Sequence, residues 1–281
     1  MTSSPPPPER PLPRASGSPL VRLAAALAAA FAAALAACGP GTAPDDASAP
    51  LRVGLEAKYP PFESRTAAGK LEGLDVDLAE AIGKHLGRGV TFSDMEFDAL
   101  LPELEAGRLD FVYSAVSRTP ERADVVDFSQ PYARVPMGVL VSASLVPEGR
   151  GLEALEAGEV SIAVQRGTSG EKKAAERFPR ARLVQFPTEV DAATEVALGR
   201  AHAFVYDVVS VVKLHERHAS ATRILDLDLG VEDYAIALRR GSPLRAAIDA
   251  FLAEGRKPGG AVDAIYARWR AELDRLHVRT E

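Results

Sequence analysis

The sequence predicts an α/β protein built from two similar lobes that are joined by two connecting strands. Three observations support this prediction. Strand and helix patterns alternate from Leu51 onward, which is typical of parallel sheets with crossover helices. The segments LEAGRLDFVY (104–113) and ALGRAHAFVY (197–206) each contain a helix end, a Gly-Arg pair and an apolar strand. Extended segments at about 135–143 and 229–238 flank the unit that holds the second copy.

The first unit alternates three expected strands with two expected helices. The strands are LRVGLE (51–56), GVTFSDM (89–95) and LDFVYSAV (109–116). The helices are LDVDLAEAIGKHLG (74–87) and DALLPELEAG (98–107). The last strand is nearly continuously apolar, as a strand buried on both faces is. Asp98 is the expected N-cap of the second helix, and Asp75 and Asp77 are interpreted as acids that cap the first.

The second unit repeats this order. Its strands are EVSIAV (159–164), RLVQF (182–186) and AHAFVYDVV (201–209). Its helices are SGEKKAAERF (169–178) and EVDAATEVALG (189–199). Thr168 and Glu171 have the spacing of a capping box at the start of the first of these helices.

Two amphipathic helices come next, and they indicate that the chain returns to the first lobe. We therefore expect residues 51–139 and 231–281 to form lobe 1 and residues 140–230 to form lobe 2. Two crossovers between lobes make a hinge that can close around a ligand. Ligands of open parallel sheets bind beyond the carboxyl ends of the strands, so the residues after each Phe-Val-Tyr should face the cleft.

The N-terminal segment is interpreted as a targeting signal. Residues 1–37 combine a Pro- and Ser-rich start, three arginines and an apolar run that is short for a membrane span. The run ends on Leu-Ala-Ala-Cys, which resembles a lipobox, and this implies that Cys38 becomes a lipid-bearing N-terminus. The alternative is an Ala-rich export signal in which Cys38 is incidental. Residues 38–50 are small and polar, as a flexible tether is.

Composition narrows the function further. The chain has 281 residues with 47% hydrophobic and 26% charged side chains, which suits a globular protein. The net charge of −6 and the lack of a basic block argue against a nucleic-acid partner. One cysteine allows neither a disulfide within the chain nor a zinc site, and His215 and His218 are read as helix surface. We expect no metal and no cofactor, and a monomer.

Arg122 and Asp207 are the two charges that the repeated strands carry to the cleft. Arg122 lies in a first helical turn, where a cation opposes the helix dipole unless an anion such as a carboxylate binds there. The alternatives are a solvated arginine or one paired with Glu121 or Asp124. Asp207 follows an apolar strand and would suit an ammonium group. The alternative is that Asp207 only caps the next helix.

Six segments together resemble the polar amino-acid-binding proteins of bacterial ABC importers, which belong to extracellular solute-binding protein family 3. The segments are YPPFE (59–63), GLDVDLAEAIGKHLG (73–87), FDALLPELEAGRLD (97–110), SRTPERADVVDFSQPY (117–132), VQRGTSGE (164–171) and DYAIALRRGSPL (233–244). The resemblance covers nearly all of 51–275. It implies a two-lobe periplasmic binding protein fold, the type II Venus-flytrap with two hinge crossovers.

The resemblance also implies roles for particular residues. Arg122 would hold the α-carboxylate of an amino acid and Asp207 its α-ammonium. The other residues expected to contact the ligand are Ser114, Ser117, Thr168, Ser169, Tyr59, Phe97, Glu56 and Arg166. Among these, the serines would bind the ligand backbone, and Tyr59 and Phe97 would sandwich its side chain.

Two of these residues bear on which amino acid is bound. Glu56 stands where relatives often have an aspartate and favours a cationic side chain, whereas Arg166 favours an anionic one. Alternatively, the two could pair across the cleft and leave room for a neutral polar ligand. The resemblance therefore implies a lipid-anchored, extracytoplasmic protein that delivers an amino acid to an ABC transporter permease. The alternatives are an enzyme like cyclohexadienyl dehydratase, with Glu56 as the proton-transfer group, and an amino-acid sensor module.

Overall fold

The computed structural model describes residues 49–280. The expected signal peptide, Cys38 and nearly all of the expected tether lie outside these residues. Within residues 49–280, no helix is both long and apolar enough to cross a membrane.

The first sheet has the strand order β4-β1-β5-β13-β6. Its strands are β1 (Leu51–Leu55), β4 (Val90–Asp94), β5 (Phe111–Val112), β6 (Val126–Phe128) and β13 (Ala237–Arg239). Strand β1 pairs in parallel with β4 and β5, and β13 runs antiparallel between β5 and β6. A separate small hairpin joins β2 (Ser64–Arg65) to β3 (Leu71–Glu72).

The second sheet has the order β11-β7-β10-β8-β9. Its strands are β7 (Ala133–Ser142), β8 (Ser161–Gln165), β9 (Arg182–Phe186), β10 (Ala203–Asp207) and β11 (Thr222–Leu225). Strand β8 pairs in parallel with β9 and β10, while β7 is antiparallel to β10 and β11. The two sheets thus have equivalent orders, and each places one of the repeated Phe-Val-Tyr segments at its centre.

The Gly-Arg pairs before these central strands are also equivalent in structure. Gly107 and Gly199 both adopt left-handed backbone conformations, with φ of 74° and 69°, as glycines that end helices commonly do. Arg108 forms an ion pair with Glu103, five residues earlier, and Arg200 does the same with Glu195. The sequence repeat therefore marks one helix-to-strand turn that is built twice.

Helices cover both faces of each sheet. They are α2 (Leu74–His85), α3 (Phe97–Glu105), α4 (Pro120–Ala123), α5 (Gly151–Glu156), α6 (Ser169–Arg177), α7 (Glu189–Ala197), α8 (Val208–Arg217), α9 (Leu244–Gly255) and α10 (Ala261–Arg275). Helices α2, α9 and α10 bury their apolar stripes in one cluster with β1. Helix α3 packs in a separate cluster with β5 and β6. In the second lobe α6 packs in one cluster with β8, while α7 and α8 join the other.

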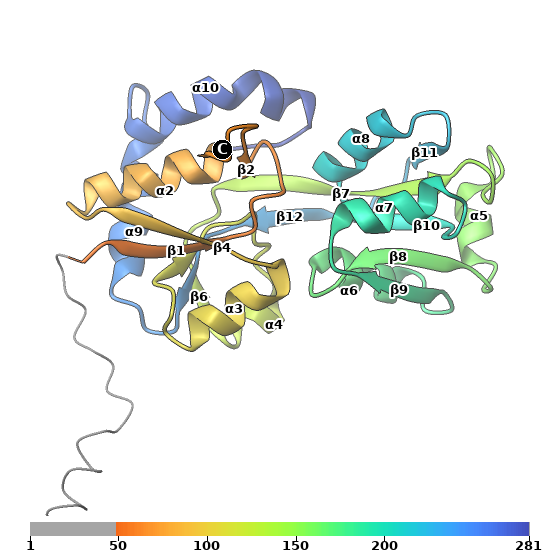
Figure 1. Ribbon diagram of the computed structural model, residues 1–281, viewed down its shortest axis with the longest axis horizontal. Helices are drawn as coiled ribbons and strands as arrows, with labels where there is room; N and C mark the ends of the chain where they lie inside the picture. Colours follow the sequence, from red (N-terminus) through yellow and green to blue (C-terminus); the bar gives the residue numbers. More distant parts are fainter. Residues whose placement is uncertain (1–48, 281) are drawn as a thin grey trace, which may run out of the picture. The chain divides into compact units, whose positions relative to one another are not determined.

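Two extended segments connect the lobes, as predicted. The first half of β7 pairs with β12 (Val231–Tyr234), and its second half enters the second sheet (Figure 1). Strand β12 is followed by β13 in the first sheet. The predicted lobe boundaries, 139/140 and 230/231, fall inside β7 and just before β12. They remain a prediction.

Three local expectations were wrong. Glu96, not Asp98, occupies the N-cap position of α3, because this helix begins at Phe97, two residues earlier than an N-cap at Asp98 requires. The strand expected over 109–116 forms ladder pairs only at Phe111–Val112, since the chain turns at Ala115, whose φ is 46°. Asp75 does not cap α2, and its carboxylate instead accepts hydrogen bonds from distant groups. The capping interaction at Thr168 is confirmed, because its hydroxyl accepts the amide of Glu171.

Candidate functional site

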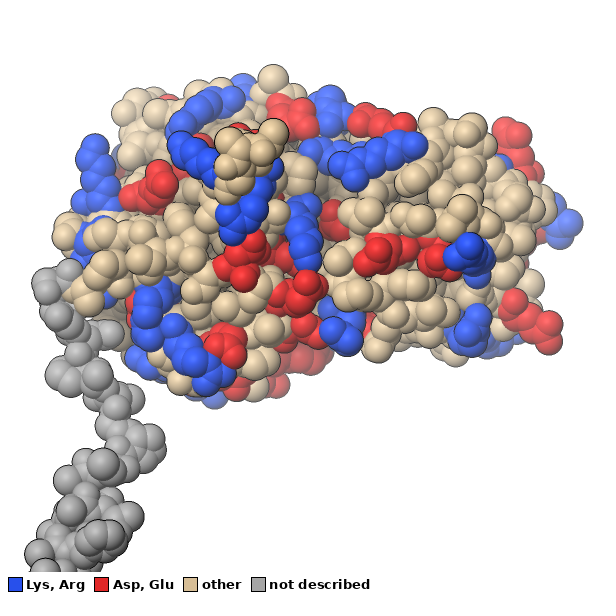
Figure 2. All heavy atoms as spheres, in the orientation of Figure 1, with Lys and Arg blue, Asp and Glu red and all other residues tan. Residues whose placement is uncertain are grey.

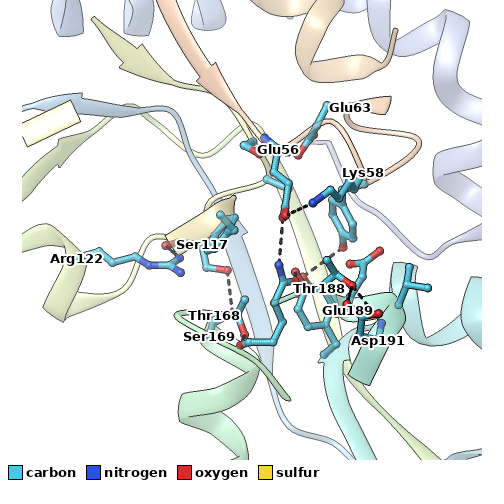
Figure 3. Close-up of a pocket in the computed structure, with 18 residues that line it drawn as sticks. Glu56, Lys58, Glu63, Ser117, Arg122, Thr168, Ser169, Thr188, Glu189 and Asp191 are labelled. Atoms are coloured by element: carbon cyan, nitrogen blue, oxygen red, sulfur yellow. Dashed lines mark hydrogen bonds and ion pairs between the residues drawn. The ribbon is translucent and has the colours of Figure 1, made fainter. Parts of the chain in front are cut away.

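A cavity of about 280 Å³ lies where the carboxyl ends of the central strands meet, and both lobes line it (Figure 3). Nine of the ten predicted ligand residues line this cavity: Glu56, Tyr59, Phe97, Ser114, Ser117, Arg122, Thr168, Ser169 and Asp207. Ligand cavities for drug-sized molecules span roughly 300–1,000 Å³, so this one suits a smaller molecule. What these residues do for a ligand remains a prediction.

Arg122 extends from the single turn α4, which Thr119 caps by accepting the amide of Arg122. Its Nη1 donates to the carbonyl of Ser117 at 2.8 Å, and its Nη2 donates to the carbonyl of Gly167 in the other lobe at 3.0 Å. The guanidinium also lies 5.3 Å from the ring centre of Phe97. Every partner of this cation is neutral, and burial lowers the pKa of Arg122.

Neither of the ion pairs expected as alternatives for Arg122, with Glu121 or with Asp124, occurs. Glu121 pairs with Lys172 instead, and none of the described residues forms an ion pair with Arg122. The cation is therefore held in place without being neutralised, which is the arrangement that an anionic ligand requires.

Asp207 ends β10 and occupies the N-cap position of α8, but its side chain makes no capping hydrogen bond. The hydroxyl of Tyr59 donates to its Oδ2 at 3.3 Å, and that hydroxyl lies 3.1 Å from the hydroxyl of Tyr234. Within the described part of the chain, Oδ1 is buried without a hydrogen-bond partner. Burial raises the pKa of Asp207 to about 7, although hydrogen bonding from Tyr234 opposes this.

An unpartnered carboxylate oxygen on a residue that is only 7% exposed is costly in isolation. An ammonium group from a ligand would supply the missing hydrogen bond and the missing positive charge. The capping alternative for Asp207 is therefore wrong, and the cation-binding interpretation agrees with the geometry.

Glu56 lies at another part of the cavity, directly after β1. Its Oε2 accepts a hydrogen bond from Nε2 of Gln165 at 3.1 Å, and its Oε1 lies 3.4 Å from Nζ of Lys58 (Figure 3). The same ammonium group lies 2.8 Å from Glu96. Burial raises the pKa of Glu56, and the hydrogen bond from Gln165 and the charge of Lys58 lower it.

Arg166 is the predicted site residue that does not line the cavity. It pairs with Asp98 at 2.5 Å, not with Glu56, and its side chain is half exposed. Successive residues of a strand point to opposite faces, so Gln165 at the end of β8 faces the cavity and Arg166 points away. The expected preference of Arg166 for an anionic ligand, and its pairing with Glu56, are therefore corrected.

The serines fall into two groups. The hydroxyls of Ser117 and Ser169 lie 3.1 Å apart and join the lobes directly. The hydroxyl of Ser114 accepts the amide of Glu56 at 3.0 Å and donates to Glu63 at 2.7 Å. Ser114 thus orders the loop after β1, in addition to lining the cavity.

A buried acid pair, Glu63 and Asp75, lies behind Ser114. Asp75 accepts hydrogen bonds from the amide of Ala115 at 2.9 Å and the hydroxyl of Tyr132 at 2.7 Å. Burial raises the pKa of Asp75 to about 7, and burial together with the charge of Asp75 raises that of Glu63 well above its usual value. This pair fixes the turn at Ala115, which lines the cavity.

Sequence reasoning missed seven other polar residues that line the cavity: Lys58, Glu63, Gln165, Thr188, Glu189, Asp191 and Tyr206. Tyr206 donates to Oε1 of Gln165 at 2.9 Å, and Ser210 donates to Oε2 of Glu189 at 2.8 Å. The alternation of β8 and β10 could have indicated Gln165. Glu189 gave no such signal, because an acid at the first position of a helix is common.

Ion pairs outside the cavity also connect the lobes. Asp98 and Glu121 of the first lobe pair with Arg166 and Lys172 of the second. On the opposite side, Arg275 of α10 pairs with Glu216 of α8 at 2.6 Å. Figure 2 shows acidic and basic side chains meeting along the border between the lobes. These pairs are partly exposed, unlike Asp207.

Comparison with known proteins agrees with this architecture. Residues 51–272 match the sequence family described as bacterial extracellular solute-binding proteins, family 3. The chain is 30% identical over 226 residues to the L-arginine-binding protein of Pseudomonas aeruginosa, covering 75% of this chain and 85% of that protein. It is 26% identical over 220 residues to the L-cystine-binding protein of Escherichia coli, covering 78% and 82%.

Solved structures give the same result. An ancestral arginine-binding protein bound to arginine superposes with a TM-score of 0.68 at 35% identity, covering 78% of this chain and 97% of that one. An ancestral amino acid-binding protein, described as a precursor of cyclohexadienyl dehydratase, gives a TM-score of 0.67 at 35% identity, covering 78% and 94%.

Proposed function

Because the chain belongs to the bacterial extracellular solute-binding proteins of family 3, we propose that it captures an amino acid outside the cytoplasm and delivers it to an ABC importer. One observation carries this proposal. Arg122 and Asp207 lie on different lobes, line one cavity, and are each hydrogen-bonded to neutral groups and to no charged group among the described residues. An α-amino acid is a zwitterion that supplies a counter-ion to both.

The binding mode follows from the charges. The α-carboxylate pairs with Arg122 and receives hydrogen bonds from Ser117, Thr168 or Ser169, and the α-ammonium pairs with Asp207. Both contacts reach one molecule only when the lobes are closed, so the ligand stabilises the closed state. Charge-assisted hydrogen bonds are strong in a cavity from which water is excluded. Micromolar binding, about −8 kcal/mol, is within reach of such a clamp.

The chain acts outside the cytoplasm, as the family does. We propose that residues 1–37 direct export, that Cys38 carries a lipid and that residues 38–50 tether the domain to the membrane. Two acyl chains would anchor it stably. The partner in delivery is the permease of the importer, which the monomeric, closed protein would contact.

Binding without turnover is the other part of the proposal. The dehydratase alternative needs a proton donor, and besides Glu56 the cavity contains Glu189, whose pKa burial raises to about 8. Incubation with prephenate and with arogenate, followed by product detection, tests this alternative. We expect neither to be converted.

The proposal is tested by a thermal-shift screen of the purified protein against the twenty amino acids. A ligand at 100 times its Kd stabilises the native state by about 2.7 kcal/mol, which raises Tm measurably. We expect one or a few L-amino acids to raise Tm and decarboxylated or N-acetylated analogues to have no effect. A protein that responds to none of the twenty would contradict the proposed function.

A further inference from the structure

Beyond Arg122 and Asp207, acidic groups outnumber basic ones in the cavity. Among the described residues, the remaining lining contains the acids Glu56, Glu63, Glu189 and Asp191 and a single cation, Lys58. That cation is shared, because Nζ of Lys58 lies 3.4 Å from Glu56 and 2.8 Å from Glu96 outside the lining. Lys58 therefore does not balance the acids of the second lobe.

Among these acids, Glu189 of the second lobe is buried and has no ion-pair partner in the described part of the chain. It begins α7 and is only 9% exposed. In the described part of the chain, its carboxyl group receives one hydrogen bond, from Ser210 to Oε2 at 2.8 Å. The charge of Lys213 acts on Glu189, but Nζ of Lys213 donates to the carbonyl of Pro60 at 2.8 Å and lies 3.5 Å from Glu272.

Most of the groups that face Glu189 are acidic or neutral, and the cation among them is Lys213. Glu56 and Tyr59 approach from the first lobe, Tyr206 and Asp207 from β10, and Ser210 and Lys213 from α8. Burial is the main cause that raises the pKa of Glu189 to about 8, and the charges of Glu56 and Asp207 add to it. A neighbouring positive charge would reverse this effect and ionise the carboxyl group.

We propose that Glu189, together with Glu56 of the facing lobe, binds the cationic end of the ligand side chain, so that the substrate class is the basic amino acids. The inference rests on the proposed function, because the backbone contacts to Arg122 and Asp207 direct the side chain toward these acids. A guanidinium or ammonium group offers several donors to two carboxylates that approach from opposite lobes. Glu189 thereby selects ligands with a positively charged side chain, whereas Arg122 and Asp207 bind the α-carboxylate and α-ammonium that all α-amino acids share.

Calorimetric titration of the purified protein with L-arginine and with its neutral isostere L-citrulline tests the inference. Hydrogen bonds to charged groups contribute about 1.5–3 kcal/mol, so arginine should bind at least about tenfold more tightly than citrulline. At pH 7 arginine should also release protons that citrulline does not, as measured in buffers of different ionisation enthalpy.

The variant Glu189→Gln should remove most of the arginine preference and the extra proton release, while it changes citrulline binding by less than about threefold. The matched control Glu195→Gln lies on the same helix, where Glu195 pairs with Arg200 outside the cavity, and should behave as the unmodified protein.

The possible outcomes separate a failure of this inference from a failure of the proposed function. If the unmodified protein binds citrulline as tightly as arginine, the inference is wrong, although the proposed function stands. The same holds if Glu189→Gln keeps the full preference for arginine. If no amino acid binds, both are wrong. The comparison of arginine with citrulline needs no variant, so it remains decisive even if Glu189→Gln does not fold.

Discussion

In the first lobe the central strand β5 leads to Arg122, whereas in the second lobe the equivalent strand β10 ends on Asp207. The turns before these strands are alike, with a left-handed glycine and an arginine paired to a glutamate five residues earlier. The two charges beyond the strands differ in sign and in the groups that hold them. Carbonyl oxygens orient the guanidinium, and tyrosine hydroxyls orient the carboxylate.

This difference shows that two lobes with the same strand order can present opposite charges to one cavity. Neutral partners fix the position of each charge without cancelling it. Glu56 shows the contrast, because Lys58 already lies beside it. A charge held by neutral groups remains available to a ligand, whereas a charge paired within the protein is already partly neutralised.

Arg122→Ala removes the positive charge that the first lobe presents to the cavity, and it should have the largest effect. Removing one partner of a buried charge pair costs about 2–5 kcal/mol, so binding of every amino acid should weaken by at least about thirtyfold. Calorimetry measures this loss. Arg118→Ala is the control, because Arg118 is exposed, near in sequence and outside the cavity. Affinity within twofold of the unmodified protein in Arg122→Ala would refute the clamp.

Asp207→Asn tests the charge of the second lobe. It should weaken binding by about tenfold or more, since it removes the counter-ion of the α-ammonium. The unmodified protein should also lose affinity for a neutral ligand such as citrulline as the pH falls from 8 to 6. The reason is that Asp207, with a pKa of about 7, must lose its proton to bind an ammonium group. This pH dependence should be nearly absent in Asp207→Asn, and its persistence would assign it to another group.

Asp75→Asn addresses the buried acid of the first lobe that accepts hydrogen bonds from the amide of Ala115 and the hydroxyl of Tyr132. The folded pKa of Asp75, about 7, lies above its ordinary 3.8, so its contribution to stability is present below pH 4 and is lost as the pH rises through 7. Asparagine keeps an acceptor for Ala115 and Tyr132. We expect the Tm of Asp75→Asn to fall less than that of the unmodified protein between pH 5 and 8. Parallel Tm curves would exclude Asp75 as the cause.

Glu216→Gln is expected to have the smallest effect, because it removes one partly exposed ion pair between the lobes. Such pairs contribute about 0.2–1 kcal/mol, so all ligands should weaken equally and by less than about fivefold. Glu254→Gln, which removes a pair within the first lobe, is the control. A change in the ratio of arginine to citrulline affinity would show that the pair acts on the cavity instead of on closure.

Much of the fold was predictable because its signals are local. Strand and helix periods, the capping residue Thr168 and the two Gly-Arg turns all lie within short segments of the chain. The parallel pairing of β1 with β4 and β5, and of β8 with β9 and β10, follows from the alternation of strands and helices along the chain. The residues at which the strands end could not be predicted from local signals. Strand β5 is an example, because the turn at Ala115 is fixed by Asp75, 40 positions away along the chain.

The candidate site was predictable where position after a strand decides it, as for Arg122 and Asp207. The prediction failed where the position or the role of a side chain depends on residues that face it from another part of the chain. Arg166 was misplaced because a shift of one residue along a strand reverses the side chain, and Asp98 draws it out of the cavity. Glu189 was missed because its importance comes from Glu56 and Asp207, which are distant in sequence.

The partly exposed ion pairs that join the lobes, such as Arg275 with Glu216, have a consequence for the setting in which the protein acts. Dissolved salt weakens exposed ion pairs, because the Debye length falls from about 30 Å at 0.01 M to about 3 Å at 1 M, whereas buried charges are screened much less. Outside the cytoplasm the salt concentration follows the surroundings of the cell. Closure should therefore become harder in brine and easier in fresh water, and uptake would vary with the salinity of the habitat even though the ligand and its contacts stay the same.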